Sequence, residues 1–418
     1  MKRYLFDKFN LFTLISIIIL YFSLLIGFYY NENSTGGAYG DYYSHKEISK
    51  TFADNFLNTL LNFDKTHTRH SPVLLILFSF FEKFEISDYV IRLINLHICL
   101  FLPFIFYKCL KKKFINVNNN YLVLLSCLIF LSPTFRSTAI WPDSRVWGLI
   151  FICLSIYYFL IYNSTKKIKH CYLVILFYTV SSYISPNFSV YSIFFMLFFF
   201  KDFKINKNLE LIILNLLLAF PALYYIFILD NNFMFAATAV PGGSNEPFSI
   251  NDISNKFLII SSIVIFYLIP FLISKSVKIP IQNLNAKKLI IILILFCISI
   301  FFFNYKLNYT GGGIFFKISN IFFGNNFVFL IIAVLSLILN FLIFSHSKNN
   351  YLIIFIIALS NPQITIYHKY YDPFLLILFL TLFNLNLEKK KLFSKKSIFI
   401  FYLFSLFFLS LSIFKSYV

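Results

Sequence analysis

Charged residues are scarce in this chain, and their scarcity decides which solvent it is built for. Only 13% of the 418 residues are Asp, Glu, Lys or Arg, whereas 59% are hydrophobic. Soluble domains contain roughly 25% charged and 45–50% apolar residues, so an ordinary water-soluble enzyme is excluded. The apolar content is also far too high for a disordered or collagen-like chain. The remaining class is a membrane protein.

Cysteine is rare as well, and its spacing shows no metal or disulfide pattern. The six Cys residues lie in or beside apolar stretches, without a Cys-x-x-Cys pair or a Cys/His cluster. A thiolate metal site and a disulfide framework are therefore not indicated. Thiols in such surroundings behave as small apolar residues.

Long apolar runs are what the chain has instead. A bilayer core of about 30 Å needs roughly 20 apolar residues per helix, and backbone groups in lipid must pair within the helix. Alternating ten-residue segments, which would form a barrel, do not occur. We predict an all-α polytopic membrane protein with about thirteen transmembrane helices. They are expected near residues 11–28, 89–109, 121–134, 146–163, 171–185, 188–201, 209–229, 256–274, 288–304, 325–345, 351–366, 372–386 and 396–414, with a tight hairpin at Ser185-Pro186-Asn187.

The basic residues favour one orientation of these helices. With the N-terminus in the cytoplasm, most of the 36 Lys and Arg residues fall in cytoplasmic loops, where Asp7, Asp202, Glu210 and Glu388 are the only carboxylates. That side then carries the whole formal charge of +19, as the positive-inside rule requires. The charge is thus a topology signal, and no nucleic-acid partner is expected. We predict one integral membrane domain over residues 1–418 in a bacterial inner membrane.

The first periplasmic loop, residues 29–88, is by far the longest, and surface helices are expected in it. Ser44-His45-Lys46-Glu47 has the capping-box pattern, and apolar residues then recur every three or four positions. This predicts an amphipathic helix lying flat on the outer membrane surface, with Glu47 in its cap. Asp41 precedes it in a glycine-flanked turn, either as a solvated turn residue or as a general base toward a hydroxyl.

A second segment of this loop combines cations with the start of a helix. Two His and two cations in 65–70 precede Ser71 and Pro72, which suit an N-cap and a first helical turn. Because exposed N–H groups at a helix N-terminus favour anions, Arg69 and His70 are candidate phosphate ligands; a solvated basic loop is the alternative. A metal site on His67 and His70 is a weaker alternative, since no carboxylate is fixed beside them.

Charged residues also stand at the outer ends of other spans. Asp143 and Arg145 open the fourth span, where they bind a substrate, pair with each other or anchor the span. Arg92, at the outer end of the second span, is interpreted as a snorkelling anchor.

The segment between spans eleven and twelve carries His368, Lys369 and Tyr371. A binding role and an aromatic membrane anchor both stay open for it. All these candidates are expected at one membrane surface. A carboxylate with several cations suits transfer from a lipid phosphate, because the base deprotonates an acceptor hydroxyl while the cations stabilise the departing phosphate.

The order of these motifs resembles the GT-C superfamily of membrane glycosyltransferases, in particular its protein mannosyltransferases and aminoarabinose transferases. The resemblance covers residues 1–200 in order and is patchy beyond. A single Asp41 stands where many members have an Asp-Glu pair, and Ser71 replaces the first Pro of a His/Lys-Pro-Pro-Leu-like segment. The matching segments are Gly40-Asp41-Tyr42-Tyr43, His70-Ser71-Pro72-Val73-Leu74, Arg92-Leu93-Ile94-Asn95, Lys111-Lys112-Lys113, Leu131-Ser132-Pro133, Asp143-Ser144-Arg145, Ser185-Pro186-Asn187 and Tyr370-Tyr371-Asp372-Pro373.

This resemblance implies a polyprenyl-phosphate-linked sugar donor and an inverting transfer on the periplasmic face, in cell-surface polysaccharide or glycolipid assembly. Asp41 would be the base, and Arg145, His70, His368 and Lys369 would lie near the phosphate or the acceptor. A lipid-linked glycan, lipid A and a protein stay open as acceptors, and no cofactor is certain, although a divalent metal stays open.

Three further hypotheses remain. One is an O-antigen-type polymerase, which is expected to place its large loop later in the chain. Another is a lipid-linked sugar flippase or transporter, which is expected to carry polar residues near span midpoints; here the polar groups gather at one surface. The last is a structural membrane subunit without catalytic activity.

Overall fold

Helices make up the computed structural model, which describes residues 10–66, 68, 70–231, 233, 252–280, 282, 286–306, 311–361, 363 and 365–417. Over this part of the chain, β-structure is limited to one isolated bridge between Val277 and Leu387. The chain divides into two compact units, residues 1–236 with 401–418 (unit 1) and residues 237–400 (unit 2).

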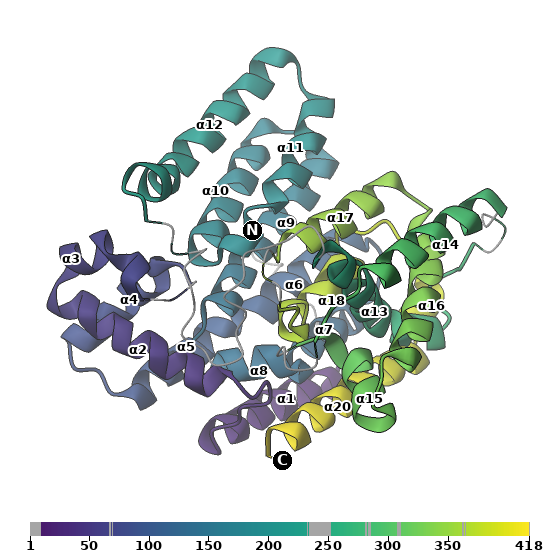
Figure 1. Ribbon diagram of the computed structural model, residues 1–418, viewed down its shortest axis with the longest axis horizontal. Helices are drawn as coiled ribbons and strands as arrows, with labels where there is room; N and C mark the ends of the chain where they lie inside the picture. The colour runs from purple at the N-terminus through teal and green to yellow at the C-terminus, as the bar shows by residue number, and fades with distance from the viewer. Residues whose placement is uncertain are drawn as a thin grey trace. The chain divides into compact units, whose positions relative to one another are not determined.

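Unit 1 contains the first twelve helices of the chain (Figure 1). They are α1 (Leu11–Tyr29), α2 (Ala38–Asp54), α3 (Phe56–Leu61), α4 (Pro72–Lys83), α5 (Asp88–Cys99), α6 (Phe101–Lys113), α7 (Asn119–Cys127), α8 (Pro133–Ile140), α9 (Ser144–Thr165), α10 (Ile168–Ile184), α11 (Tyr191–Asp202) and α12 (Ile205–Leu223). Within this unit α9 packs against α6 and α10, and α12 packs against α10 and α11.

Unit 2 is built around one deeply buried helix. It contains α13 (Asp252–Ile273), α14 (Ala286–Phe301), α15 (Gly313–Phe323), α16 (Phe327–Phe344), α17 (Lys348–Leu359), α18 (Phe374–Leu380) and α19 (Lys389–Leu392), and α20 (Lys395–Tyr417) leads back to unit 1. The apolar window of α13 is 78% buried, because α14, α15, α16, α17 and α18 all contact it.

Seven helices in the described ranges are long and apolar enough to cross a membrane. They are Leu11–Tyr29, Asp88–Lys113, Ser144–Thr165, Ile205–Ile228, Ile253–Ile273, Phe327–Phe344 and Lys395–Lys415. An eighth candidate is the pair Asn119–Leu131 and Pro133–Ile140, which is bent by 66°. Both units therefore hold candidate spans, and the protein is an α-helical membrane protein with several crossings.

The other five expected crossings are shorter helices, namely α10, α11, α14, α17 and α18. The 12 residues of α11, for example, rise about 18 Å, which is less than the roughly 30 Å of a bilayer core. Thirteen crossings therefore stay a prediction. The chain does break where a hairpin is expected, since a 3₁₀ turn at Pro186–Phe188 separates α10 from α11.

The long loop after α1 contains α2, α3, α4 and a 3₁₀ turn, but α2 begins earlier than its capping pattern predicts. It starts at Ala38, so the prediction that Ser44 begins the helix and Glu47 caps it is wrong. The Ala38 N–H donates to Oδ1 of Asn33 at 3.1 Å, which satisfies one N-terminal donor from outside the helix. Asp41 lies in the first turn of α2, where a negative charge is favourable.

The apolar side of α2 packs on protein. Phe52 is 1% exposed and forms a small core with Phe63, Leu75 and Phe233. The hydroxyl of Tyr225, just beyond α12, donates to the carbonyl of Leu60 at 2.7 Å. The face that was expected to contact lipid is thus covered in part by α4 and by the end of α12.

We predict that the two ends of the span Asp88–Lys113 lie on opposite sides of the membrane. In a Cys297→Ser background, Glu85→Cys should react with a membrane-impermeant maleimide in intact spheroplasts, and Lys111→Cys only in inverted vesicles. The five other native cysteines are buried and should give little background. Labelling of both positions from one side would contradict a crossing here.

Candidate functional site

His70 lies where three segments of unit 1 meet. Its Nδ1 is 3.3 Å from Oγ of Ser144, the first residue of α9. Its ring lies edge-on to the ring of His45 in α2, with 4.3 Å between the centroids. His70 therefore joins the surface helix α2 to the beginning of a candidate span.

The residue after His70 anchors this loop to a third helix. Ser71 is the N-cap of α4 and accepts from the N–H of Val73 at 3.3 Å, with Pro72 at the first helical position. This confirms the predicted helix start. The same hydroxyl donates to the carbonyl of Tyr183 near the end of α10, so one side chain both starts α4 and holds the loop in place.

Asp143 and Arg145 frame the contact between His70 and Ser144. Asp143 is 2% exposed and is the N-cap of α9, because its Oδ1 accepts from the N–H of Arg145 at 2.7 Å. This contact between the two residues is thus a helix cap from a side chain to a backbone N–H. The side chain of Arg145 is half-buried and lies one residue after Ser144.

Asp41 is half-buried on α2. It shares a helix face with His45, because residues four apart lie one above the other. His45 is 2% exposed and was missed from the sequence, where it falls within the supposed capping box. The structure thus brings His70 to the segment Asp143–Arg145 and links both to the Asp41 face of α2 through His45.

The other candidates belong to unit 2 or fall outside the described residues. Arg69, like His67, falls outside the described residues. His368, Lys369 and Tyr371 belong to unit 2, where the His368 ring packs against Phe266 at 5.1 Å and Tyr267 at 5.2 Å. Tyr371 is 3% exposed, so the aromatic-anchor interpretation does not fit it. No group of three or more metal-ligating side chains occurs among the described residues.

Unit 2 also contains a buried lysine that the sequence analysis missed. Lys256, near the start of α13, is 5% exposed, and its Nζ donates to the carbonyl of Asn361. In the sequence it is a cation at the end of an apolar run, where cations are ordinary. Only the packing around α13 shows that it is buried.

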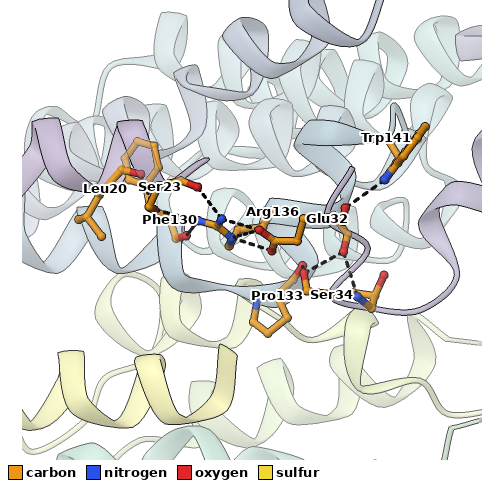
Figure 2. Close-up of polar contacts among 10 residues, drawn as sticks. Leu20, Ser23, Glu32, Ser34, Phe130, Pro133, Arg136 and Trp141 are labelled. Atoms are coloured by element: carbon orange, nitrogen blue, oxygen red, sulfur yellow. Dashed lines mark hydrogen bonds and ion pairs between the residues drawn. The ribbon is translucent and has the colours of Figure 1, made fainter. Parts of the chain in front are cut away.

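A buried ion pair between Glu32 and Arg136 holds the segment that precedes α2. Figure 2 shows that Nε of Arg136 donates to both carboxylate oxygens of Glu32, at 2.8 and 3.0 Å, while Nη2 donates to Oε2 at 2.5 Å. The two side chains are 5% and 8% exposed. Nη1 and Nη2 also donate to the hydroxyl and the carbonyl of Ser23, at 3.0 and 2.8 Å. Arg136 therefore ties α1 and α8 to the segment that leads into α2.

That leading segment makes further hydrogen bonds with α8. Nε1 of Trp141 donates to the carbonyl of Glu32 at 3.0 Å, and the hydroxyl of Ser34 donates to the carbonyl of Pro133 at 2.9 Å (Figure 2). The N–H of Thr35 donates to Oγ of Ser137 at 2.9 Å. The segment that leads into α2 is thus held by hydrogen bonds of its backbone as well as of its side chains.

Arg92 stacks on this framework from α5. Its guanidinium lies 3.6 Å from the ring centroid of Trp141, and its Nε donates to the carbonyl of Ile140 at 3.1 Å. Arg92 is only 8% exposed. The prediction that it snorkels to water is wrong, because Trp141 and Phe28 cover it. Trp141 also contacts the ring of Tyr39 at 4.8 Å.

A second ion pair joins α2 to the start of α5. Nζ of Lys46 lies 2.5 Å from Oδ1 of Asp88, which also accepts from the Tyr42 hydroxyl at 3.2 Å. Burial lowers the pKa of Lys46, but the hydrogen bond and charge of Asp88 reverse this and leave that pKa raised. Burial raises the pKa of Glu82, 3.9 Å from Lys46, although Lys46 opposes it.

Comparisons with known proteins identify no relative: no protein-family model, no curated protein and no solved structure matches the chain.

We predict that Gly27→Ala destabilises the protein. A Cβ at Gly27 would lie 2.3 Å from Oε2 of Glu32 and 2.7 Å from Nη2 of Arg136, so the buried pair must shift. The expected cost is about 1–3 kcal/mol, measured as thermal unfolding in detergent. Gly40→Ala is the control, because a Cβ there meets nothing within 4 Å. It should be neutral or stabilising, and a Gly27→Ala protein of wild-type stability would refute the argument.

Proposed function

We propose that this protein is a membrane glycosyltransferase that moves a sugar from a polyprenyl-phosphate-linked donor to an acceptor hydroxyl. The observation that carries the proposal is the contact of His70 with Ser144, between Asp143 and Arg145. It joins two segments far apart in the chain, and the ring contact of His70 with His45 links them to the helix that bears Asp41. A multi-pass position in the bacterial inner membrane, with the site facing the periplasm, belongs to the same proposal and is supported by the distribution of lysines.

The chemistry assigned to this site is an inverting displacement. Asp41 takes the proton from the acceptor hydroxyl, whose oxygen forms a bond to the anomeric carbon of the sugar. The bond from that carbon to the phosphate oxygen breaks at the same time, and the electron pair leaves with the phosphate. His70 and Arg145 stabilise the developing negative charge, because fixed cations are most effective where water is partly excluded.

Asp143 and His45 have supporting roles in this scheme. Asp143 caps α9, which keeps Arg145 in the first turn of that helix. His45 packs its buried ring against His70 and sets the direction in which that imidazole points. Both act through the residues that they position.

A transporter of lipid-linked sugars is the second candidate, and Lys256 is the observation that favours it. Buried ionisable residues in membrane spans commonly line a substrate path, and Lys256 lies inside the candidate span Ile253–Ile273. The two candidates differ in which residue is essential. A transporter should lose activity with Lys256→Met and keep it with Asp41→Asn.

We predict that Asp41→Asn abolishes transfer, because the amide cannot accept the hydroxyl proton. The loss should be at least about 100-fold. It is measured by mass spectrometry of surface glycolipids in a strain lacking the gene and complemented with each variant. Asp54→Asn, at the exposed end of the same helix, is the matched control and should restore the wild-type glycolipids. Full complementation by Asp41→Asn would remove the proposed base.

We predict that His45→Leu lowers transfer about tenfold through misplacement of His70. His45→Phe, which keeps an aromatic ring against His70, should recover most of the activity. In a His70→Ala background, His45→Leu should cause no further loss, whereas a general folding defect would lower both backgrounds alike. His97→Leu, at the Tyr21 contact in α5, is the control for loss of a histidine from unit 1.

A further inference from the structure

A group of cations at the end of α6 and the start of α10 lies apart from the proposed site. It consists of Lys112 in the last turn of α6, Lys167 at the N-cap of α10, and Lys169 and His170 in its first turn. α9 packs against both helices and ends at Thr165. Cys109 in α6 donates to the carbonyl of Cys153 in α9 at 3.6 Å. Five residues further along α9, Tyr158 stacks on His170, so the end of α6 and the start of α10 lie beside neighbouring turns of α9.

His170 lies in a cationic environment. Burial lowers the pKa of His170, and the charges of Lys169, Lys167 and Lys112 lower it further. Its ring stacks on Tyr158 at 6.4 Å between centroids. Its Nδ1 is buried and has no hydrogen-bond partner within the described residues. A polar atom of this kind calls for a ligand or a water molecule.

Two nearby lysines form ion pairs with carboxylates, whereas Lys112, Lys167 and Lys169 form none within the described part of the chain. Lys166 lies 2.5 Å from Asp202, and Lys207 lies 2.8 Å from Glu210. The hydrogen bond from Lys166, and then that from Tyr162, lower the pKa of Asp202. No described carboxylate lies within ion-pair distance of Lys112, Lys167 or Lys169. Three positive charges therefore lie in this group without a carboxylate counter-ion among the described residues.

Helix stability explains only part of this arrangement. Lys112 suits a helix C-terminus, where cations are favourable. Lys167 and Lys169 stand at a helix N-terminus, where cations are unfavourable, and no side chain caps α10. The N–H groups of that first turn favour an anion, as do the lysines around them.

We propose that Lys112, Lys167, Lys169 and His170 bind the phosphodiester headgroup of an anionic phospholipid. α6 and α9 end the candidate spans Asp88–Lys113 and Ser144–Thr165, so the group lies at the depth where headgroup phosphates are found. The headgroup supplies the missing negative charge and an acceptor for His170. This inference is independent of the proposed function.

The test is binding of phosphatidylglycerol to the detergent-purified full chain by native mass spectrometry, with phosphatidylcholine as the neutral lipid. The wild type should bind phosphatidylglycerol about tenfold more tightly than phosphatidylcholine. The triple variant Lys112→Gln, Lys167→Gln, Lys169→Gln should lose this preference. The triple variant Lys201→Gln, Lys204→Gln, Lys207→Gln removes the same charge from the α11–α12 turn and should keep it.

Three results would overturn the proposal. They are equal binding of both lipids by the wild type, an undiminished preference in the first triple variant, or an equal loss in both triple variants. Excess inorganic phosphate is a further arm: tight binding of phosphate alone, with no preference for phosphatidylglycerol, would mean a site for a free anion. Thermal unfolding in phosphatidylcholine controls for folding, and the first triple variant should be at least as stable as the wild type because repulsion is relieved.

Discussion

The buried pair of Glu32 and Arg136 is the interaction on which the part of unit 1 around α2 and α8 depends. Removing two charges from water is costly unless the partners and further hydrogen bonds satisfy them. Here the carboxylate receives three guanidinium contacts, and Ser23 and the carbonyl of Phe130 accept from the terminal guanidinium nitrogens. Because Glu32 lies in the segment between α1 and α2 and Arg136 lies in α8, the pair holds the segment that leads into α2. The position of Asp41 follows from that segment.

The proposed site is supported by groups that start helices. Ser71 begins α4 and Asp143 begins α9, and each lies one or two positions from a residue that the proposed chemistry uses. A helix cap is a local and rigid device, so it places the next side chain with little freedom. The ion pair of Lys46 and Asp88 also holds α2 against the start of α5. These polar contacts thus fix the helices that carry the residues of the proposed site.

The cations around α2 and α8 have different partners from the cations at the start of α10. Around α2 and α8, cations meet carboxylates or aromatic rings, as Arg136, Lys46 and Arg92 do. At the start of α10, lysines meet one another and a histidine. The positive-inside rule accounts for an excess of lysine on one side, but not for lysines at a helix N-terminus. The proposed anionic headgroup would supply the negative charge that lysines at a helix N-terminus require.

Sequence alone established that this is a helical membrane protein, because a backbone in lipid must satisfy its hydrogen bonds within the helix and long apolar runs reveal such helices. It also located the Ser71–Pro72 helix start, since a cap depends on adjacent residues. It misplaced the start of α2, because Asn33 caps that helix across a turn, and it misjudged Arg92, whose cover comes from Trp141. The His45–His70 contact, buried Lys256 and the Glu32–Arg136 pair were decided by tertiary packing. These partners are distant in the chain, 104 positions apart for Glu32 and Arg136, and local patterns carry no record of such pairing.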